Sequence, residues 1–224
     1  MNRYVSGAAV AILLALFAGG AGVHAQGSTA QARGSDPSAI VPYKISIDEG
    51  VINDLKVRLA RTRFTDEIRG TGGEYGTDLN YLRGLVAYWR NSFDWRAAER
   101  RLNELEQFTT TIDGVQIHFI HQKSKDPKAM PLAITHGWPG SIFEFSKVIG
   151  PLTDPERNGG KPGDAFNVVA ISLPGFGFSG HPASRGYSPE RMAKIIATLM
   201  ALLGYTKYGV QGGDWGRIIR RLLA

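Results

Sequence analysis

The stretch Tyr208-Gly209-Val210-Gln211-Gly212-Gly213-Asp214-Trp215-Gly216 predicts both a fold and a chemistry. Its first four residues have strand character, and the rest has the form Gly-x-Asp-x-Gly, a sharp turn from a strand into a helix that presents its central residue at the edge of an α/β sheet. The usual central residue is serine. An aspartate would instead attack an electrophilic carbon and form an alkyl ester. The alternative is that Asp214 caps the following helix.

A second loop, His136-Gly137-Trp138-Pro139-Gly140, follows the apolar segment Met130 to Thr135. In this architecture the loop after an earlier strand donates one backbone N–H to an oxyanion hole, and the residue after the nucleophile donates another. We therefore expect Trp138 and Trp215 to be the oxyanion donors. The alternative is a structural Gly-Pro turn. The residues expected to support the two turns are His136, Gly137, Pro139, Gly212, Gly213 and Gly216.

Strands and helices alternate around these two loops. Apolar strands are predicted at 130–135, 166–173 and 208–211, with helices at 142–149 and after Ser188-Pro189. Such alternation predicts an α/β fold with a mostly parallel sheet and helices on both faces. Function lies beyond the carboxyl ends of such strands, which here means the loops 136–141, 174–180 and 212–216.

The preceding residues are predicted to form helices and then a hairpin. Ser46-Ile47-Asp48-Glu49 fits a capping box, and apolar residues recur after it at helical spacing. Two further helices are expected around residues 79–89 and 95–105. Residues 108–112 and 115–121 then predict a β-hairpin around a tight Asp113-Gly114 turn.

The first residues resemble an export signal. Arg3 precedes an apolar stretch from Ala8 to Ala18, and Val23-His24-Ala25 forms a small-residue cleavage site. We expect residues 1–25 to be a signal peptide that is cleaved near Ala25, so that the protein is periplasmic or secreted. The alternative is an uncleaved membrane anchor. Residues 26–40 are rich in glycine, serine, alanine and glutamine, which predicts a flexible linker.

Composition excludes several other classes of function. The chain has 224 residues, a net charge of +6 and no cysteine, so that thiolate metal sites and cysteine nucleophiles are excluded. Its arginines mix with apolar residues on predicted helices, which indicates solvated faces rather than nucleic-acid binding.

Gly175 to Gly180 matches the dinucleotide-binding pattern G-x-G-x-x-G, but no helix follows directly. His118 and His121 lie three apart in a strand, hence on opposite faces. We therefore expect neither cofactor nor metal.

These motifs together resemble epoxide hydrolases of the microsomal type, on the α/β-hydrolase fold. The matching segments are Tyr43 to Ile47, Thr62-Arg63-Phe64, Asp94-Trp95-Arg96, Ile112-Asp113-Gly114, Ile117-His118-Phe119, His136 to Ser141, Pro174 to Ser179 and Gly212 to Gly216. The resemblance implies an N-terminal meander over residues 41–128. It implies that Asp214 opens an epoxide to a vicinal diol through an aspartyl ester, which a histidine backed by a carboxylate hydrolyses. Cap-domain tyrosines are implied to protonate the epoxide oxygen.

The sequence departs from this pattern after Gly216. An acid and then a histidine follow the nucleophile in α/β-hydrolases, whereas the last eight residues contain no His, Asp, Glu or Tyr. Arg217, Arg220 and Arg221 also stand in a helix that the family largely buries. We therefore interpret residues 129–224 as the incomplete first half of a hydrolase core. Two alternative functions remain open, a non-catalytic truncated remnant and a hydrolase similar to haloalkane dehalogenases.

Overall fold

The structure is a computed structural model that describes residue 36 and residues 38–223. The predicted signal peptide and residues 26–35 of the predicted linker lie outside the described residues. At the end of that linker, the backbone carbonyl of Ser38 accepts a hydrogen bond of 2.8 Å from Thr110 Oγ1, and Ile40 packs against the core.

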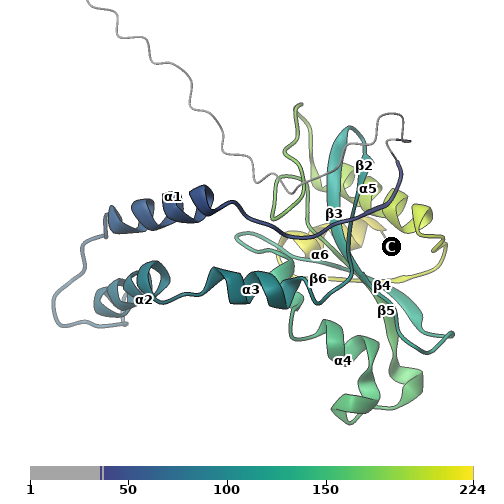
Figure 1. Ribbon diagram of the computed structural model, residues 1–224, viewed down its shortest axis with the longest axis horizontal. Coiled ribbons are helices and arrows are strands. Elements are labelled where there is room, and N and C mark those ends of the chain that lie inside the picture. The colour runs from purple at the N-terminus through teal and green to yellow at the C-terminus, as the bar shows by residue number, and fades with distance from the viewer. Residues whose placement is uncertain (1–35, 37, 224) are drawn as a thin grey trace, which may run out of the picture.

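Six strands form a single sheet in the order β1-β2-β3-β5-β4-β6 (Figure 1). Their bounds are Val41–Pro42 (β1), Gln107–Ile112 (β2), Val115–Gln122 (β3), Met130–Thr135 (β4), Phe166–Ile171 (β5) and Gly209–Gly212 (β6). Strand β4 pairs in parallel with both β5 and β6, which confirms the parallel sheet predicted after residue 130. The pairs β1–β2, β2–β3 and β3–β5 are antiparallel, so the sheet as a whole is mixed.

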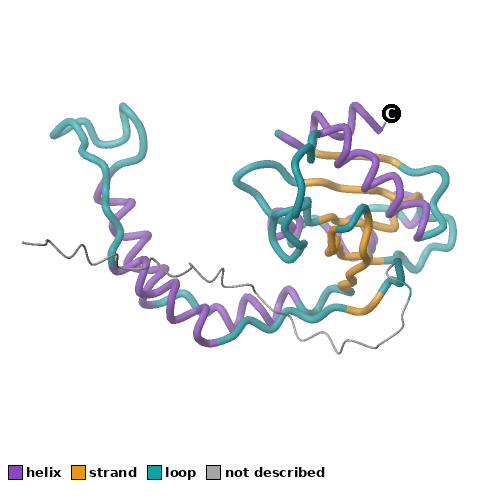
Figure 2. Tube along the Cα trace, turned by 90° about the horizontal axis from the view of Figure 1, so that it is seen from above, coloured by secondary structure: helices purple, strands orange, loops and turns teal. Residues whose placement is uncertain are grey.

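Helices cover both faces of the sheet, as the alternation of strands and helices predicts (Figure 2). The helices are α1 (Glu49–Ala60), α2 (Leu79–Asn91), α3 (Trp95–Leu102), α4 (Ile149–Thr153), α5 (Pro189–Leu202) and α6 (Trp215–Leu223). Short 3-10 helices lie at Ile142–Phe145, Pro155–Asn158 and Pro162–Asp164. Helices α5 and α6 pack on one face, and α4 with the first 3-10 helix packs on the other.

Alternation along the strands produces these two cores. In β5, Val169 and Ile171 face the core under α5 and α6, whereas Val168 and Ala170 face the core under α4. All four side chains are fully buried. Successive residues of a strand point to opposite faces, so a strand covered on both sides is apolar throughout.

The hairpin between β2 and β3 forms where it is predicted. Asp113 and Gly114 both adopt positive φ, at 53° and 75°, and Ile112 pairs with Val115 across the turn. A two-residue turn with both φ angles positive matches the twist of the strands, and Asp-Gly is among the pairs that adopt it most readily.

Residues 43–103, which we call the arm, extend to one side of the sheet (Figures 1 and 2). Helices α1 and α2 pack against each other, and neither contains a buried residue. Helix α3 connects them to the sheet and buries Leu102. Asn103 holds the first residues of the arm, because its side chain bonds both the N–H and the carbonyl of Ile45, over 2.9 and 2.8 Å.

Two local predictions are wrong. The N-cap of α1 is Asp48 rather than Ser46, and its carboxylate accepts from Gly50 N–H over 2.7 Å. The helix predicted over residues 142–149 is a 3-10 turn followed by α4, which begins at Ile149. Pro151 lies in the first turn of α4, where its missing N–H is tolerated, whereas a continuous helix from Ile142 would hold it in the interior.

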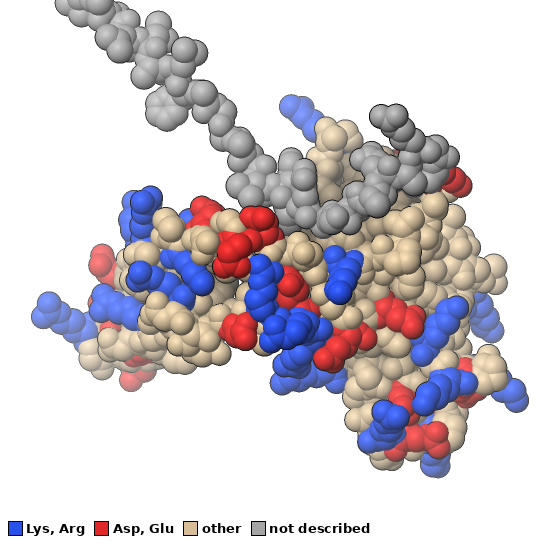
Figure 3. Space-filling model, viewed as in Figure 1, with Lys and Arg blue, Asp and Glu red and all other residues tan. Residues whose placement is uncertain are grey.

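Charges of both signs are mixed over the visible face of the arm (Figure 3). Arg96 bonds Glu49 and Glu99, and Arg58 bonds Asp54 one helical turn away. The predicted solvated helix faces are therefore neutralised in part by neighbouring carboxylates. Between residues 38 and 223, no helix combines the length and the apolar character needed to cross a bilayer.

Candidate active site

Asp214 lies on the turn between β6 and α6, with its side chain exposed to solvent. Its φ is +49°, a left-handed conformation that residues other than glycine adopt rarely and at a cost in free energy. The backbone N–H of Arg217 donates to Asp214 O over 3.0 Å, so α6 starts directly after the turn. This is the strand-to-helix geometry that the sequence predicts for a nucleophile.

The carboxylate of Asp214 faces the loop that follows β4. The backbone N–H of Trp138 donates to Asp214 Oδ1 over 2.8 Å, across 76 positions of sequence. This N–H, together with a smaller contribution from the N–H of Trp215, holds the pKa of Asp214 below its ordinary value of 3.8. The structure therefore brings together the three residues predicted as nucleophile and oxyanion donors. A bond to a neighbouring loop also distinguishes Asp214 from a simple cap of α6.

Three glycines allow the two loops to approach each other. A Cβ at Gly137 would lie 2.5 Å from Asp214 Oδ1, and one at Gly216 would lie 2.5 Å from the carbonyl oxygen of Thr135. A Cβ at Gly212 would lie 2.5 Å from Thr135 Oγ1. A Cβ at Gly213 would meet nothing within 4 Å, so crowding accounts for three glycines of the predicted set and not for Gly213. Pro139 follows a cis peptide bond with Trp138.

His136 is buried, and both of its ring nitrogens are bonded. Its Nε2 accepts from the backbone N–H of Leu173 over 3.2 Å, so the proton lies on Nδ1, which donates to the carbonyl of Gly137 over 2.9 Å. Burial lowers the pKa of this imidazole, against weaker opposing effects of Gly137 and Glu144. His136 therefore joins the loop after β4 to the end of β5 as a neutral side chain.

The predicted loop Pro174 to Gly180 contacts the loop after β4 through His136. The ring of Phe176 packs edge-on against the His136 ring, with 5.3 Å between centroids. Sequence reasoning did not single out Thr135, which is fully buried and carries a hydroxyl without a hydrogen-bond partner in the structure. Thr135 lies beside Gly212 and Gly216 at the base of the site. Only the pairing of β4 with β6 brings these residues together.

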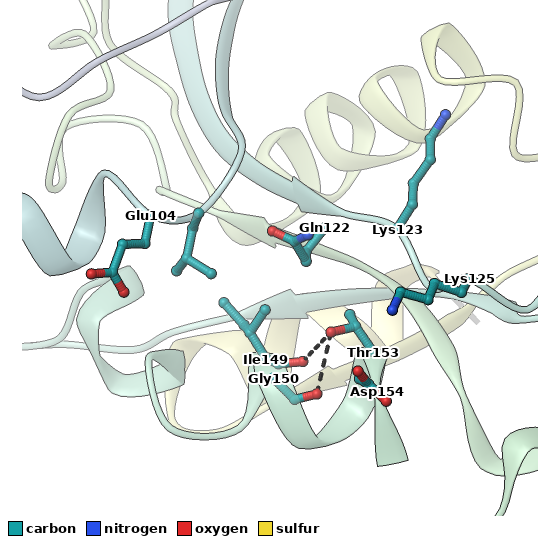
Figure 4. Close-up of a pocket in the computed structure, with 9 residues that line it drawn as sticks. Glu104, Gln122, Lys123, Lys125, Ile149, Gly150, Thr153 and Asp154 are labelled. Atoms are coloured by element: carbon teal, nitrogen blue, oxygen red, sulfur yellow. Dashed lines mark hydrogen bonds between the residues drawn. The ribbon is translucent and has the colours of Figure 1, made fainter. Parts of the chain in front are cut away.

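Three surface hollows, of about 350, 380 and 590 Å³, lie elsewhere, and Asp214 lines none of them. The hollow in Figure 4 lies between the end of β3 and α4, and its lining includes the charged residues Glu104, Lys125 and Asp154. Thr153 Oγ1, at its edge, donates within its own helix to the carbonyls of Ile149 and Gly150. The mixed charges and self-contained hydrogen bonds give this hollow no evident chemistry.

His118 and His121 do not share a ligand. His118 bonds Gln107 and Ser172, whereas His121 bonds the hydroxyl of Tyr205 on the other side of the sheet. Among the described residues no group of three or more His, Cys, Asp or Glu is placed to hold a metal ion.

Comparison with known proteins identifies the family and the fold of the chain. Residues 40–145 match the family described as epoxide hydrolase N terminus, and residues 131–224 match the α/β hydrolase fold. The chain belongs to the epoxide hydrolase family. The predicted resemblance and the predicted fold class are thereby confirmed.

Several epoxide hydrolases are similar in sequence or structure. A putative epoxide hydrolase of Stigmatella aurantiaca is 48% identical over 185 residues, which cover 83% of this chain and 42% of the relative. Epoxide hydrolase 1 of Oryctolagus cuniculus is 40% identical over 192 residues, with the same coverages. The juvenile hormone epoxide hydrolase structure of Bombyx mori aligns with a TM-score of 0.74 at 36% identity, covering 83% of this chain and 44% of that one. The chain thus spans about two fifths of the length of the curated relatives that it matches.

Proposed function

We propose that this chain carries the nucleophilic part of an epoxide hydrolase active site. The observation that carries the proposal is the exposed carboxylate of Asp214, held at φ +49° and bonded by the N–H of Trp138. One carboxylate oxygen attacks a ring carbon of an epoxide, the bond from that carbon to the ring oxygen breaks, and the oxygen takes a proton from water, which leaves hydroxide. The product of this step is a hydroxyalkyl ester of Asp214.

The second step needs oxyanion donors. When water attacks the ester carbonyl of Asp214, negative charge develops on the carbonyl oxygen. We assign the N–H groups of Trp138 and Trp215 to that oxygen, because the first already donates to the carboxylate. Hydrolysis releases a vicinal diol and restores the aspartate. Small-molecule epoxides are the proposed substrates, in keeping with the epoxide hydrolases among the relatives.

Covalent labelling tests this proposal. Incubation with styrene oxide and mass spectrometry of the intact protein and its peptides should show one adduct, located on Asp214. Asp214→Asn should remove it. Asp113 is a matched control, because it is also an exposed aspartate at positive φ but bonds Arg191 instead of a backbone donor. Equal labelling of Asp113 and Asp214 would refute a specific nucleophile.

The chain alone is expected to react once rather than turn over. Hydrolysis of the ester needs a base to activate water, and three of the four histidines among the described residues are buried and committed to other partners. His136 bonds through both nitrogens, His118 bonds Gln107 and Ser172, and His121 bonds Tyr205. This is the basis of the second candidate, a non-catalytic remnant. Steady formation of diol by the 224-residue chain, followed by chromatography, would contradict it.

A haloalkane dehalogenase would use the same aspartate on a carbon–halogen bond. The match of residues 40–145 to the N-terminal region of epoxide hydrolases favours the epoxide. Presenting styrene oxide and 1-bromobutane in parallel separates the two, since one reaction yields an adduct or diol and the other releases bromide. Bromide release with no reaction of the epoxide would reverse the assignment.

We also propose that the protein is exported and cleaved after Ala25, on the strength of the Arg3, apolar and Val23-His24-Ala25 pattern. Mass spectrometry of the N-terminal peptide, from protein expressed with its first 25 residues, tests this. A new N-terminus at Gln26 in a periplasmic or culture fraction is the expected result. An intact Met1 in a membrane fraction would favour the uncleaved anchor instead.

A further inference from the structure

A buried chain of hydrogen bonds runs from the arm to the loop beside the candidate active site, and His118 stands at its centre. His118 is fully buried on β3, and both of its ring nitrogens are bonded. Nδ1 lies 3.0 Å from Ser172 Oγ, and Nε2 lies 2.9 Å from Gln107 Oε1. The proposed chemistry uses neither nitrogen, and a buried polar ring requires both of these hydrogen bonds to avoid a penalty in free energy, so the ring links the two partners.

Toward the arm, the chain of hydrogen bonds passes through Gln107. Its amide nitrogen donates to the carbonyl of Leu102 over 2.8 Å and lies 3.4 Å from Asn103 Oδ1. Asn103 in turn holds both backbone polar groups of Ile45. Because the amide nitrogen of Gln107 points at acceptors, its oxygen is free to accept from His118. The proton of the neutral imidazole therefore lies on Nε2, and Nδ1 accepts from Ser172.

Toward the site, the chain of hydrogen bonds ends in the loop Pro174 to Gly180. Ser179 Oγ donates to the carbonyl of Ser172 over 2.7 Å and accepts from the backbone N–H of His118 over 2.9 Å. A Cβ at Gly177, whose φ is +55°, would lie 3.1 Å from Ser172 Oγ, so the loop folds closely over this hydroxyl. Phe178 from the same loop packs edge-on against the His118 ring at 5.2 Å.

The loop then touches the residues around Asp214. Leu173, directly before the loop, donates its N–H to His136, and Phe176 within the loop packs on the same imidazole. His136 bonds Gly137, next to the Trp138 N–H that reaches Asp214. A continuous series of direct contacts thus connects Ile45 in the arm to the carboxylate of Asp214.

We propose that His118 is a positioning residue that lets the arm fix the loop Pro174 to Gly180, and through it the donors that face Asp214. Two alternative accounts exist. His118 could serve only to satisfy buried polar groups, or the loop could be held entirely by its own turn. Both predict that a change at Gln107, which does not touch the loop, leaves the loop unaffected. The inference rests on the proposed function only where the reactivity of Asp214 is measured.

Amide hydrogen exchange gives a test that does not need reactivity. Gln107→Leu keeps the size of the side chain and removes the bond to His118. We expect exchange within residues 175–180 to rise about tenfold relative to residues 166–171 of β5. His121→Gln is the matched control, since His121 is buried on the same strand but bonds Tyr205. It should leave exchange of the loop within about twofold of the unmodified protein. Unchanged exchange of the loop in Gln107→Leu would overturn the proposal.

A pair of substitutions at His118 separates the two ends of the chain of hydrogen bonds. His118→Asn places an acceptor near Nδ1 and keeps the bond from Ser172, whereas His118→Gln places a donor near Nε2 and keeps the bond to Gln107. The asparagine variant should protect the loop better, and the glutamine variant should protect residues 43–47 better. A uniform rise of exchange across the whole sheet in both variants would indicate general destabilisation and would also overturn the proposal.

Labelling of Asp214 supplies the functional readout. If His118 positions the loop, the maximal rate of labelling by styrene oxide should fall in Gln107→Leu and stay unchanged in His121→Gln. The concentration of epoxide that gives half of that rate should move little, because the donors rather than the bound substrate are displaced. An unlabelled parent protein would count against the proposed function alone, since the exchange experiments would still decide the role of His118.

Discussion

The arm and the rest of the described chain have a similar fraction of apolar residues but differ in how many of them are buried. Helices α1 and α2 contain no buried residue, and Tyr81, Tyr88 and Trp89 are about half exposed or more. Strands β3 and β5, in contrast, hold Ile117, Phe119 and Val169 with no exposed surface. The helices of the arm are therefore stabilised by contacts with one another and by side-chain hydrogen bonds, whereas burial on two faces stabilises the sheet.

The largest expected difference between the two regions concerns aromatic truncation. Phe119→Ala should lower the free energy of unfolding by about 3–5 kcal/mol, because its ring is fully buried and stacks on Phe108. Tyr88→Ala in the arm should change it by about 0.5 kcal/mol or less. Urea unfolding followed by tryptophan fluorescence measures both. Equal losses would mean that the arm unfolds together with the sheet.

A glycine-to-alanine pair gives the next largest contrast, with opposite signs. Gly216→Ala forces a methyl group against the Thr135 backbone and should cost about 1–3 kcal/mol. Gly84→Ala on α2 meets nothing within 4 Å and should stabilise that helix by about 0.5–1 kcal/mol. Thermal unfolding measures the loss of stability in Gly216→Ala, and circular dichroism measures the gain of helix in Gly84→Ala. A neutral Gly216→Ala would show that the turn carrying Asp214 can relax.

Acid should weaken the sheet through its histidines, since the arm contains none. Burial lowers the pKa of His118 from 6.5 to about 3, so the folded protein keeps this ring neutral while the unfolded chain protonates it. The resulting stability is complete above pH 6.5 and is lost as pH falls toward 3. The slope should reach about 1.4 kcal/mol per pH unit for this group.

Urea unfolding at a series of pH values measures this slope, and His118→Asn should flatten it. The remaining slope should reflect the carboxylates and two further histidines. Burial and the charge of Lys123 lower the pKa of His121 to about 4, and burial also lowers the pKa of His136. An unchanged slope in His118→Asn would mean that the ring is reached by water in the folded state.

The smallest effects are expected at the helix caps. Ser188 caps α5 on the sheet and Asp48 caps α1 in the arm, each through a side-chain oxygen that accepts a backbone N–H. Removing either with alanine should cost about 1 kcal/mol locally. Ser188→Ala should lower the free energy of global unfolding, whereas Asp48→Ala should only speed amide hydrogen exchange within α1. A global loss in both variants would show that α1 unfolds together with the sheet.

The sequence predicted those features that depend on neighbouring residues. The Asp113-Gly114 turn, the bounds of β4, the Ser188 cap and the strand-turn-helix around Asp214 are all set by local conformational preference. The start of α1 was not predictable in this way. Ile47 donates its N–H to Glu99 and accepts from Arg96, so helix α3 holds Ile47 outside α1 and leaves Asp48 to cap it.

The same distinction holds for the candidate site. Gly-x-Asp-x-Gly and His-Gly-Trp-Pro indicated Asp214, Trp138 and Trp215, and the structure places them together. The contacts that support them depend on strand order, which the sequence does not state. Thr135 meets Gly216 only because β6 pairs with β4, and His136 meets Leu173 only because β5 also pairs with β4.

Both ring nitrogens of His136 already have hydrogen-bond partners, and this limits how the site can be redesigned. It is the first residue of the loop that carries the Trp138 donor, and it would be an obvious choice for conversion into a general base. Freeing either nitrogen would release Leu173 or Gly137 and so disturb the donor that the base is meant to assist. An engineered water-activating group therefore has to enter from a new position on the exposed side of Asp214.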